Sequence, residues 1–206
     1  MNNNKIEKII AGLKTVYMPG KFRFADPFKV LISVMLSQRT KDENTYKVAM
    51  RLFSTLGTPE KLSAASEKTI KEIIKSSGFY RVKAKNIKKV SQILLARHNG
   101  KVPSGFDDLM KLPGVGRKTA NCVLVFAFNK PAIPVDTHVH RISNRLRLVK
   151  TKTPEKTEKA LSKIIPRKYW IPINELMVRF GQKICKPVNP QCPSCPINNL
   201  CPSSKL

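Results

Sequence analysis

Apolar residues recur three and four positions apart along almost the whole chain, and this spacing is the strongest constraint on the fold. It is typical of helices with one buried face, whereas a half-buried strand alternates apolar and polar residues. Residues Phe28 to Leu36 are apolar nearly all round, which predicts a buried helix. The three-and-four pattern runs through 6–17, 46–53, 87–94, 120–128, 139–146 and 173–184. No segment alternates convincingly, so we expect an all-α protein of eight to eleven short helices.

Local start signals support the helical interpretation. Thr58 and Thr153 each precede a proline, as an N-cap residue precedes Pro at the first helical position. Ser104 stands three residues before Asp107, which is the spacing of a capping box. The clearest internal boundary is the proline-containing stretch 129–134.

The charge of the chain limits its partners. Its 206 residues include 39 Lys and Arg against 13 Asp and Glu, which gives a formal net charge of +26. Such an excess favours a polyanion, either nucleic acid or an acidic membrane surface. The longest apolar run, Val30 to Leu36, is too short to span a bilayer, and residues 1–8 lack the apolar core of a signal peptide. We expect an intracellular protein without a membrane span.

A glycine-containing turn, Leu112-Pro-Gly-Val-Gly-Arg-Lys-Thr-Ala120, lies between a short predicted helix and a longer one. Gly114 and Gly116 would let backbone N–H groups approach a phosphate, and the N-terminus of the next helix favours an anion. The motif is not a Walker loop, because it lacks the Gly-x4-Gly-Lys-Ser/Thr spacing and a preceding strand. The alternative interpretation is an ordinary helix-ending turn.

Asp136 immediately precedes the helix predicted to run through Leu146. An aspartate at this position commonly caps a helix by accepting backbone N–H groups. His138 and His140 are two positions apart, so they point to different faces of a helix and we expect them to be structural.

Four of the five cysteines crowd into the last 22 residues, at Cys185, Cys192, Cys195 and Cys201. Four clustered thiols in an intracellular chain indicate a soft-metal site, with zinc and an iron–sulfur cluster as the candidates. The fifth, Cys122, lies in an apolar stretch and is expected in the core.

Together, the glycine turn, the segment Val135-Asp-Thr-His-Val-His-Arg141 and the cysteine spacing resemble the endonuclease III family of helix-hairpin-helix DNA glycosylases. The resemblance covers nearly the whole chain. It implies two helical domains: a six-helix barrel with the hairpin at 22–130, and a domain at 1–21 plus 131–206 that holds a [4Fe-4S] cluster on the four cysteines. It also implies an active site in the cleft between them.

By the same resemblance, Lys118 matches the family's nucleophile and Asp136 its essential carboxylate. The implied activity is that of a bifunctional DNA glycosylase and AP lyase, which removes oxidised pyrimidines through a Lys118 Schiff base and cleaves the abasic site by β-elimination. The implied partner is damaged duplex DNA, bound by a monomer, with Gly114, Gly116, Arg117 and Lys83 expected at the phosphates.

The chain departs from the family where a glutamine usually fills the gap left by the flipped base. Arg39 occupies the best-aligned position and Gln38 precedes it. A second insertion point is expected at Phe79 and Tyr80, where an aromatic side chain can enter the base stack. Three alternatives stay open: a mismatch glycosylase for thymine, uracil or adenine, a non-catalytic iron–sulfur DNA-binding module, and a zinc-stabilised basic protein.

Overall fold

The computed structural model describes residues 3–16 and 24–204, and every regular element within these ranges is helical. The all-α prediction is therefore confirmed. Within the same ranges, no helix is both long and apolar enough to cross a membrane. The chain divides into two compact units, unit 1 comprising Met1–Gly20 and Pro131–Leu206, and unit 2 comprising Lys21–Lys130.

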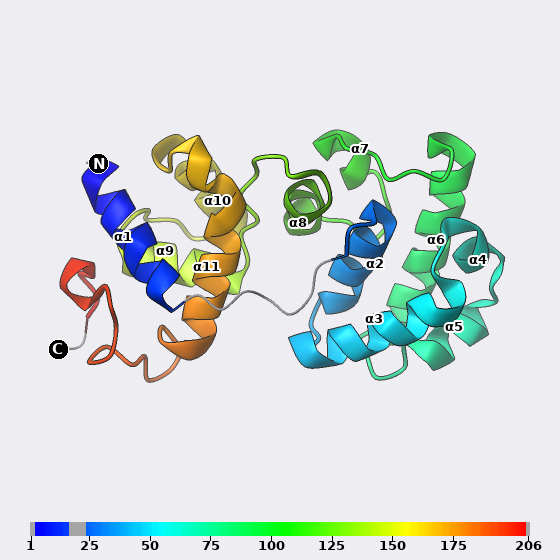
Figure 1. Ribbon diagram of the computed structural model, residues 1–206, viewed down its shortest axis with the longest axis horizontal. Coiled ribbons are helices and arrows are strands. Elements are labelled where there is room, and N and C mark those ends of the chain that lie inside the picture. Colours follow the sequence, from blue (N-terminus) through cyan, green and yellow to red (C-terminus); the bar gives the residue numbers. More distant parts are fainter. Residues whose placement is uncertain (1–2, 17–23, 205–206) are drawn as a thin grey trace. The chain divides into compact units, whose positions relative to one another are not determined.

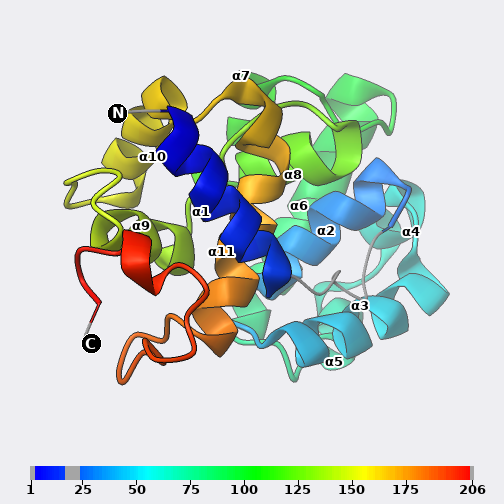
Figure 2. The same cartoon turned by 60° about the vertical axis from the view of Figure 1, so that its left-hand side comes forward.

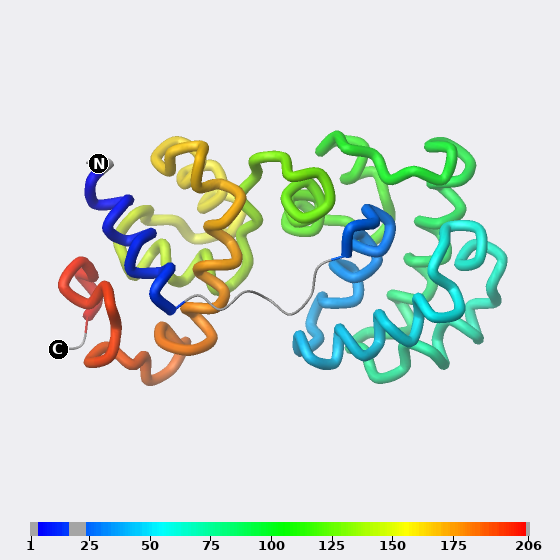
Figure 3. Tube along the Cα trace, in the orientation of Figure 1, coloured from blue at the N-terminus to red at the C-terminus, as the bar shows by residue number. Residues whose placement is uncertain are grey.

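Unit 2 is contiguous and is built around the apolar helix α2 (Figure 1). Its members are α2 (Pro27–Ser37), α3 (Asp42–Leu56), α4 (Pro59–Ala64), α5 (Glu67–Ile73), α6 (Tyr80–His98), α7 (Phe106–Met110) and α8 (Arg117–Phe128). Helix α2 packs against α3 and α8, and α4 and α5 pack against α6. Seven of the eleven residues of α2 are buried, as its sequence predicts. The chain trace shows the sharp turn that connects α7 to α8 (Figure 3).

Unit 1 combines the N-terminal helix with the C-terminal third of the chain. It contains α1 (Asn3–Thr15), α9 (Thr137–Arg145), α10 (Pro154–Ile164), α11 (Trp170–Lys183) and the short 3-10 helices η1 (Arg167–Tyr169) and η2 (Asn198–Leu200). Helix α1 lies along α11, and the two views agree on this (Figures 1 and 2). One face of α1, formed by Ile6, Ile9, Ile10 and Leu13, is almost fully buried in the core of the unit.

Most of the predicted helix starts are confirmed. The hydroxyls of Thr58 and Thr153 accept the backbone N–H groups three residues later, so each caps its helix. The prediction for Ser104 is wrong: Gly105 is the N-cap of α7, and the Ser104 side chain instead accepts from Lys130 Nζ at 3.0 Å. The Ser104 hydroxyl therefore contacts the Lys130 ammonium and does not cap the backbone N–H groups of α7.

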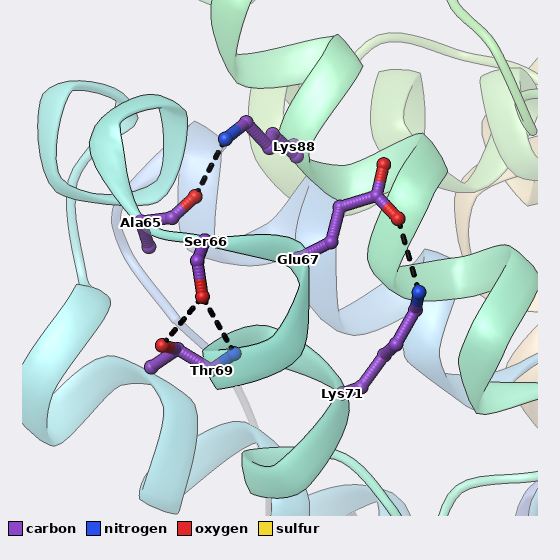
Figure 4. Close-up of polar contacts among 6 residues, drawn as sticks. All are labelled: Ala65, Ser66, Glu67, Thr69, Lys71 and Lys88. Atoms are coloured by element: carbon purple, nitrogen blue, oxygen red, sulfur yellow. Dashed lines mark hydrogen bonds and ion pairs between the residues drawn. The ribbon is translucent and has the colours of Figure 1, made fainter.

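Side chains also tie the short helices of unit 2 together (Figure 4). Ser66 caps α5 by accepting from Thr69 N at 3.0 Å, and Lys71 Nζ lies 3.1 Å from a Glu67 carboxylate oxygen. Lys88 of α6 donates to the carbonyl of Ala65, at the end of α4, at 2.7 Å. Lys88 therefore attaches α6 to the connection between α4 and α5.

Candidate functional site

The turn between α7 and α8 contains two glycines in different situations. Gly114 has φ +78°, and a Cβ built on it would lie 2.7 Å from Asn86 Nδ2, so both conformation and space require glycine. Gly116 is the N-cap of α8 with φ −95°, and no heavy atom lies within 4 Å of its ideal Cβ. Gly114 therefore serves the fold of the turn, whereas Gly116 leaves open space in front of α8.

The first turn of α8 carries Arg117 and Lys118 and contains no acidic residue. The N-cap Gly116 has no side chain to occupy the first N–H groups of the helix, and the helix dipole makes this end favourable for an anion. Lys118 is half-buried, and the guanidinium of Arg117 lies 4.8 Å from the ring centroid of Phe106. The predicted nucleophile thus follows directly on the predicted phosphate-binding turn.

Gln38, at the C-terminal end of α2, reaches this turn within unit 2. Its Nε2 donates to Gly114 O at 3.0 Å and to Thr119 Oγ1 at 3.2 Å. The amide therefore supports the turn, and Gln38 is exposed enough to be accessible as well. The structure adds an internal role that the sequence did not indicate.

The residues expected at the insertion points lie on the surface of unit 2. Phe79 is 65% exposed, so it is not part of the core and its ring is accessible. Arg39 is exposed, and its guanidinium lies 5.7 Å from the centroid of the Phe79 ring. Tyr80 is the half-buried first residue of α6, with the Arg81 guanidinium 4.7 Å from its ring centroid.

Lys83 does not have the position that we expected of a phosphate contact. It is only 5% exposed, and its ammonium donates to four oxygen atoms of the protein. Burial lowers the pKa of Lys83 to about 8. The expectation fails because Lys83 shares the buried face of α6 with Ile87 and Val90.

Asp136 is the N-cap of α9 in unit 1. Its Oδ1 accepts from the backbone N–H groups of His138 and Val139, both at 2.9 Å, which fixes the carboxylate at the helix start. The two histidines contact protein groups, as expected: His138 Nδ1 lies 3.1 Å from Arg141 Nη2, and His140 Nδ1 lies 2.6 Å from Thr157 Oγ1.

The four C-terminal cysteines line one pocket of unit 1, which encloses about 410 Å³ of empty space, part of it open to solvent. Arg145 Nη1 lies 3.3 Å from Cys185 Sγ, and burial raises the pKa of the Cys195 thiol. Among the described residues, no three His, Cys, Asp or Glu side chains are grouped as they would be around a single metal ion. Cys122 is buried, as expected.

Two arginines that the sequence patterns did not indicate support the segment around Cys185. Arg141 Nη2 donates to Cys185 O at 2.8 Å, and Arg145 donates to Lys186 O and Pro187 O, both at 2.7 Å. They are four positions apart on α9, so the helical period places them on one face. That spacing is the signal that could have identified them.

Comparison with known proteins gives the family. The chain is 54% identical to endonuclease III of Thermotoga maritima over 89% of its own length and 86% of that relative. A structure described as a trapped covalent intermediate of endonuclease III with DNA, an estranged-adenine complex, superimposes with a TM-score of 0.92 at 40% identity, covering 100% of this chain and 98% of that one. A thermostable thymine-DNA glycosylase shares the fold, with a TM-score of 0.86 at 24% identity over 98% and 97% of the chains. Residues 32–167 match the model of the HhH-GPD superfamily of base excision DNA repair proteins, and this chain belongs to that family.

Proposed function

We propose that this protein is a bifunctional DNA glycosylase and AP lyase of base excision repair, which removes oxidised pyrimidines from duplex DNA. The observation that carries the proposal is the position of Lys118, one residue into α8 and directly behind the glycine turn. It is supported by the similarity to an endonuclease III that was trapped covalently on DNA. The net charge of +26 suits a polyanionic substrate.

The proposed chemistry uses the Lys118 amine as the nucleophile. The unprotonated amine attacks C1′ of the damaged nucleotide, the bond from C1′ to the base breaks, and the base leaves with that electron pair and a proton. The C1′–O4′ bond then breaks, the second amine proton passes to O4′, and an imine between Nζ and C1′ remains. The imine acidifies the C2′ hydrogen, and removal of that proton expels the 3′ phosphate. The lysine is released when water hydrolyses the imine.

Asp136 is proposed to assist departure of the base. Its side chain is held at the start of α9 by two hydrogen bonds to one carboxylate oxygen, Oδ1. A fixed carboxylate can stabilise the positive charge that develops on the sugar as the base departs.

The four cysteines are proposed to hold a [4Fe-4S] cluster. The donor set fits this group, because four thiols line one pocket with room between them and a guanidinium lies beside Cys185 Sγ, where it suits a thiolate. When bound, the cluster would contribute folding free energy to the C-terminal segment. The residues of α9 that contact this segment, Arg141 and Arg145, would then connect it to the helix that Asp136 caps.

Borohydride trapping tests the proposal. Protein is incubated with duplexes that carry thymine glycol, dihydrouracil, uracil opposite guanine or an abasic site, with and without borohydride, and base release and strand cleavage are resolved separately. Wild-type protein should release the oxidised pyrimidines and become covalently attached. Lys118→Gln should abolish trapping and cleavage. Lys111→Gln is the matched control, because it removes an exposed lysine on the other side of the turn whose ammonium lies 2.8 Å from Asp108 across i,i+3.

The same assay separates the alternatives. Base release from uracil opposite guanine without trapping would favour a mismatch glycosylase. DNA binding without base release or trapping would favour a non-catalytic module. Trapping that survives Lys118→Gln would reject the assigned nucleophile.

A further inference from the structure

Two exposed turns of unit 2 each contain a non-glycine residue in the left-handed region. Arg39 has φ +50° in the connection from α2 to α3, and Phe79 has φ +57° in the connection from α5 to α6. This conformation is unfavourable for residues with a Cβ unless the surroundings impose it. The two side chains face each other on the surface, with the guanidinium 5.7 Å from the ring centroid. We refer to Arg39 and Phe79 as the surface pair.

The buried ammonium of Lys83 lies beneath both turns. It donates to Leu36 O and Gln38 O, both at 2.6 Å, in the first turn. It also donates to Thr40 Oγ1 at 3.0 Å and to Ser77 Oγ at 2.8 Å, which belongs to the second turn. An ammonium has three N–H donors, so these four acceptors use all of them. Leu36 and Gln38 stand at the C-terminal end of α2, where a cation is favourable.

Further hydrogen bonds join the two turns directly. Gly78 N donates to Thr40 Oγ1 at 3.2 Å, and Asn44, in the first turn of α3, donates through Nδ2 to Ser76 O at 2.6 Å. A Cβ on Gly78 would lie 2.5 Å from Arg39 O, so the backbones approach more closely than a side chain would permit. Through these contacts, the positions of Arg39 and Phe79 depend on one another.

We propose that Lys83 is a positioning residue that holds the surface pair ready to insert into duplex DNA where a base has been displaced. The inference rests on the proposed function. A guanidinium and an aromatic ring can both stack on nucleobases, so a preformed pair suits a gap in the base stack. Because the ammonium predominates at neutral pH, the hydrogen bonds that it donates are present under ordinary conditions.

The test uses Lys83→Met, which keeps an unbranched side chain as far as Cε and removes the donors. Lys88→Met is the matched control, since Lys88 lies on the same helix and donates to the carbonyl of Ala65, a residue that belongs to neither turn (Figure 4). The probe is a duplex with a tetrahydrofuran abasic analogue opposite 2-aminopurine, whose fluorescence rises when the base is unstacked. Phe79→Ala defines the signal without the aromatic side chain.

Lys83→Met should reduce the fluorescence increase at saturating protein to the level of Phe79→Ala, while Lys88→Met behaves as the wild type. Hydrogen exchange should accelerate in the peptides that cover 37–41 and 76–79. Base release from a damaged duplex should slow about tenfold, which corresponds to about 1.4 kcal/mol. If Lys83→Met does not fold, Thr40→Val should reproduce the defect, and Thr40→Ser, which keeps the hydroxyl, should restore the signal.

A normal fluorescence increase in folded Lys83→Met would overturn the inference, and so would an equal loss in Lys88→Met. The activity of the wild-type protein separates a failure of the proposed function from a failure of the inference on Lys83. If it neither traps nor releases bases, the proposed function fails and the inference fails with it. If it does both and Lys83→Met inserts normally, only the inference fails.

Discussion

Replacing Gly114 by alanine should destabilise unit 2, for two reasons that the structure separates. The residue has φ +78°, where a Cβ costs about 1–2 kcal/mol. The new methyl group would also lie 2.7 Å from Asn86 Nδ2 and 3.3 Å from Asn86 Cβ and Cγ. The amide can rotate away, but the Cβ must shift with the backbone of α6, and such overpacking costs about 1–3 kcal/mol.

One effect opposes these two. Alanine lowers the conformational entropy of the unfolded chain, which stabilises by about 0.4–1 kcal/mol. The net loss for Gly114→Ala should therefore be about 3 kcal/mol. Adding Asn86→Ala should recover the part that comes from the contacts with Nδ2 and Cγ, and leave the parts that come from the Cβ at position 86 and from φ, so the two substitutions should not be additive.

Gly116→Ala is the matched control for the same chemical change. Its methyl group meets nothing within 4 Å. The free energy of unfolding should therefore fall only by the N-cap preference for glycine over alanine, which is a few tenths to about 1 kcal/mol. Its effect should instead appear in DNA binding, because the methyl group stands in the open space before α8 where a phosphate would approach.

Urea unfolding followed by circular dichroism measures the stabilities, and fluorescence anisotropy with an undamaged duplex measures the affinities. The reasoning would be refuted if Gly114→Ala were as stable as Gly116→Ala. It would also be refuted if Asn86→Ala failed to recover any of the loss.

Three further predictions follow from the site. Asp136→Asn should slow base release severely but keep the protein folded, because an asparagine oxygen can accept hydrogen bonds from the same two N–H groups of α9. Circular dichroism and single-turnover base release would check this, and undiminished release would reject the role of the carboxylate. Anaerobically purified protein should contain four irons per chain, and Cys195→Ser should lower this content while Cys122→Ser leaves it unchanged; one zinc without iron, found by metal analysis, would contradict the cluster. The affinity for undamaged duplex should fall with salt with a log–log slope of several units, at about 0.9 per neutralised phosphate, and a slope near zero would exclude phosphate-dominated binding.

Helical periodicity predicted most of the fold because the apolar residues that recur at the helical period are also the residues that are buried in this chain. Helix α2 is apolar nearly all round and is buried nearly all round, and the Thr58 and Thr153 caps use local bonds that a short sequence motif specifies. The Ser104 cap failed because its competitor, Lys130, is 26 positions away in sequence. Local patterns carry no information about such a partner.

The site residues were predictable where a short sequence motif carries the function. They were less predictable where tertiary packing decides whether a side chain is exposed. Lys83 is the clearest case, since it was expected at a phosphate and is instead buried. Its spacing to Ile87, Val90 and Leu94 is four, seven and eleven positions, which places it on the buried stripe. The periodicity was sufficient to predict its burial, but only the structure supplies the carbonyl and hydroxyl oxygens that make a buried ammonium tolerable.

The discontinuity of unit 1 has a consequence for biosynthesis. Helix α1 ends at Thr15 and its partner α11 begins at Trp170, so about 150 residues must be made before the two can meet. At about 5–20 residues per second, α1 waits roughly 10–30 s for its partner. A helix of 13 residues is marginal alone, so its apolar face stays in contact with water or chaperones during this interval.

Unit 2 needs no later segment, so it can fold while the rest of the chain is still being synthesised. Ribosome-bound chains stalled just before α11 emerges should then resist protease within 24–130 and be cleaved within α1. Docking of the N-terminal helix would be a late event in the maturation of this protein, and substitutions in α1 would affect the nascent chain before they affect DNA binding.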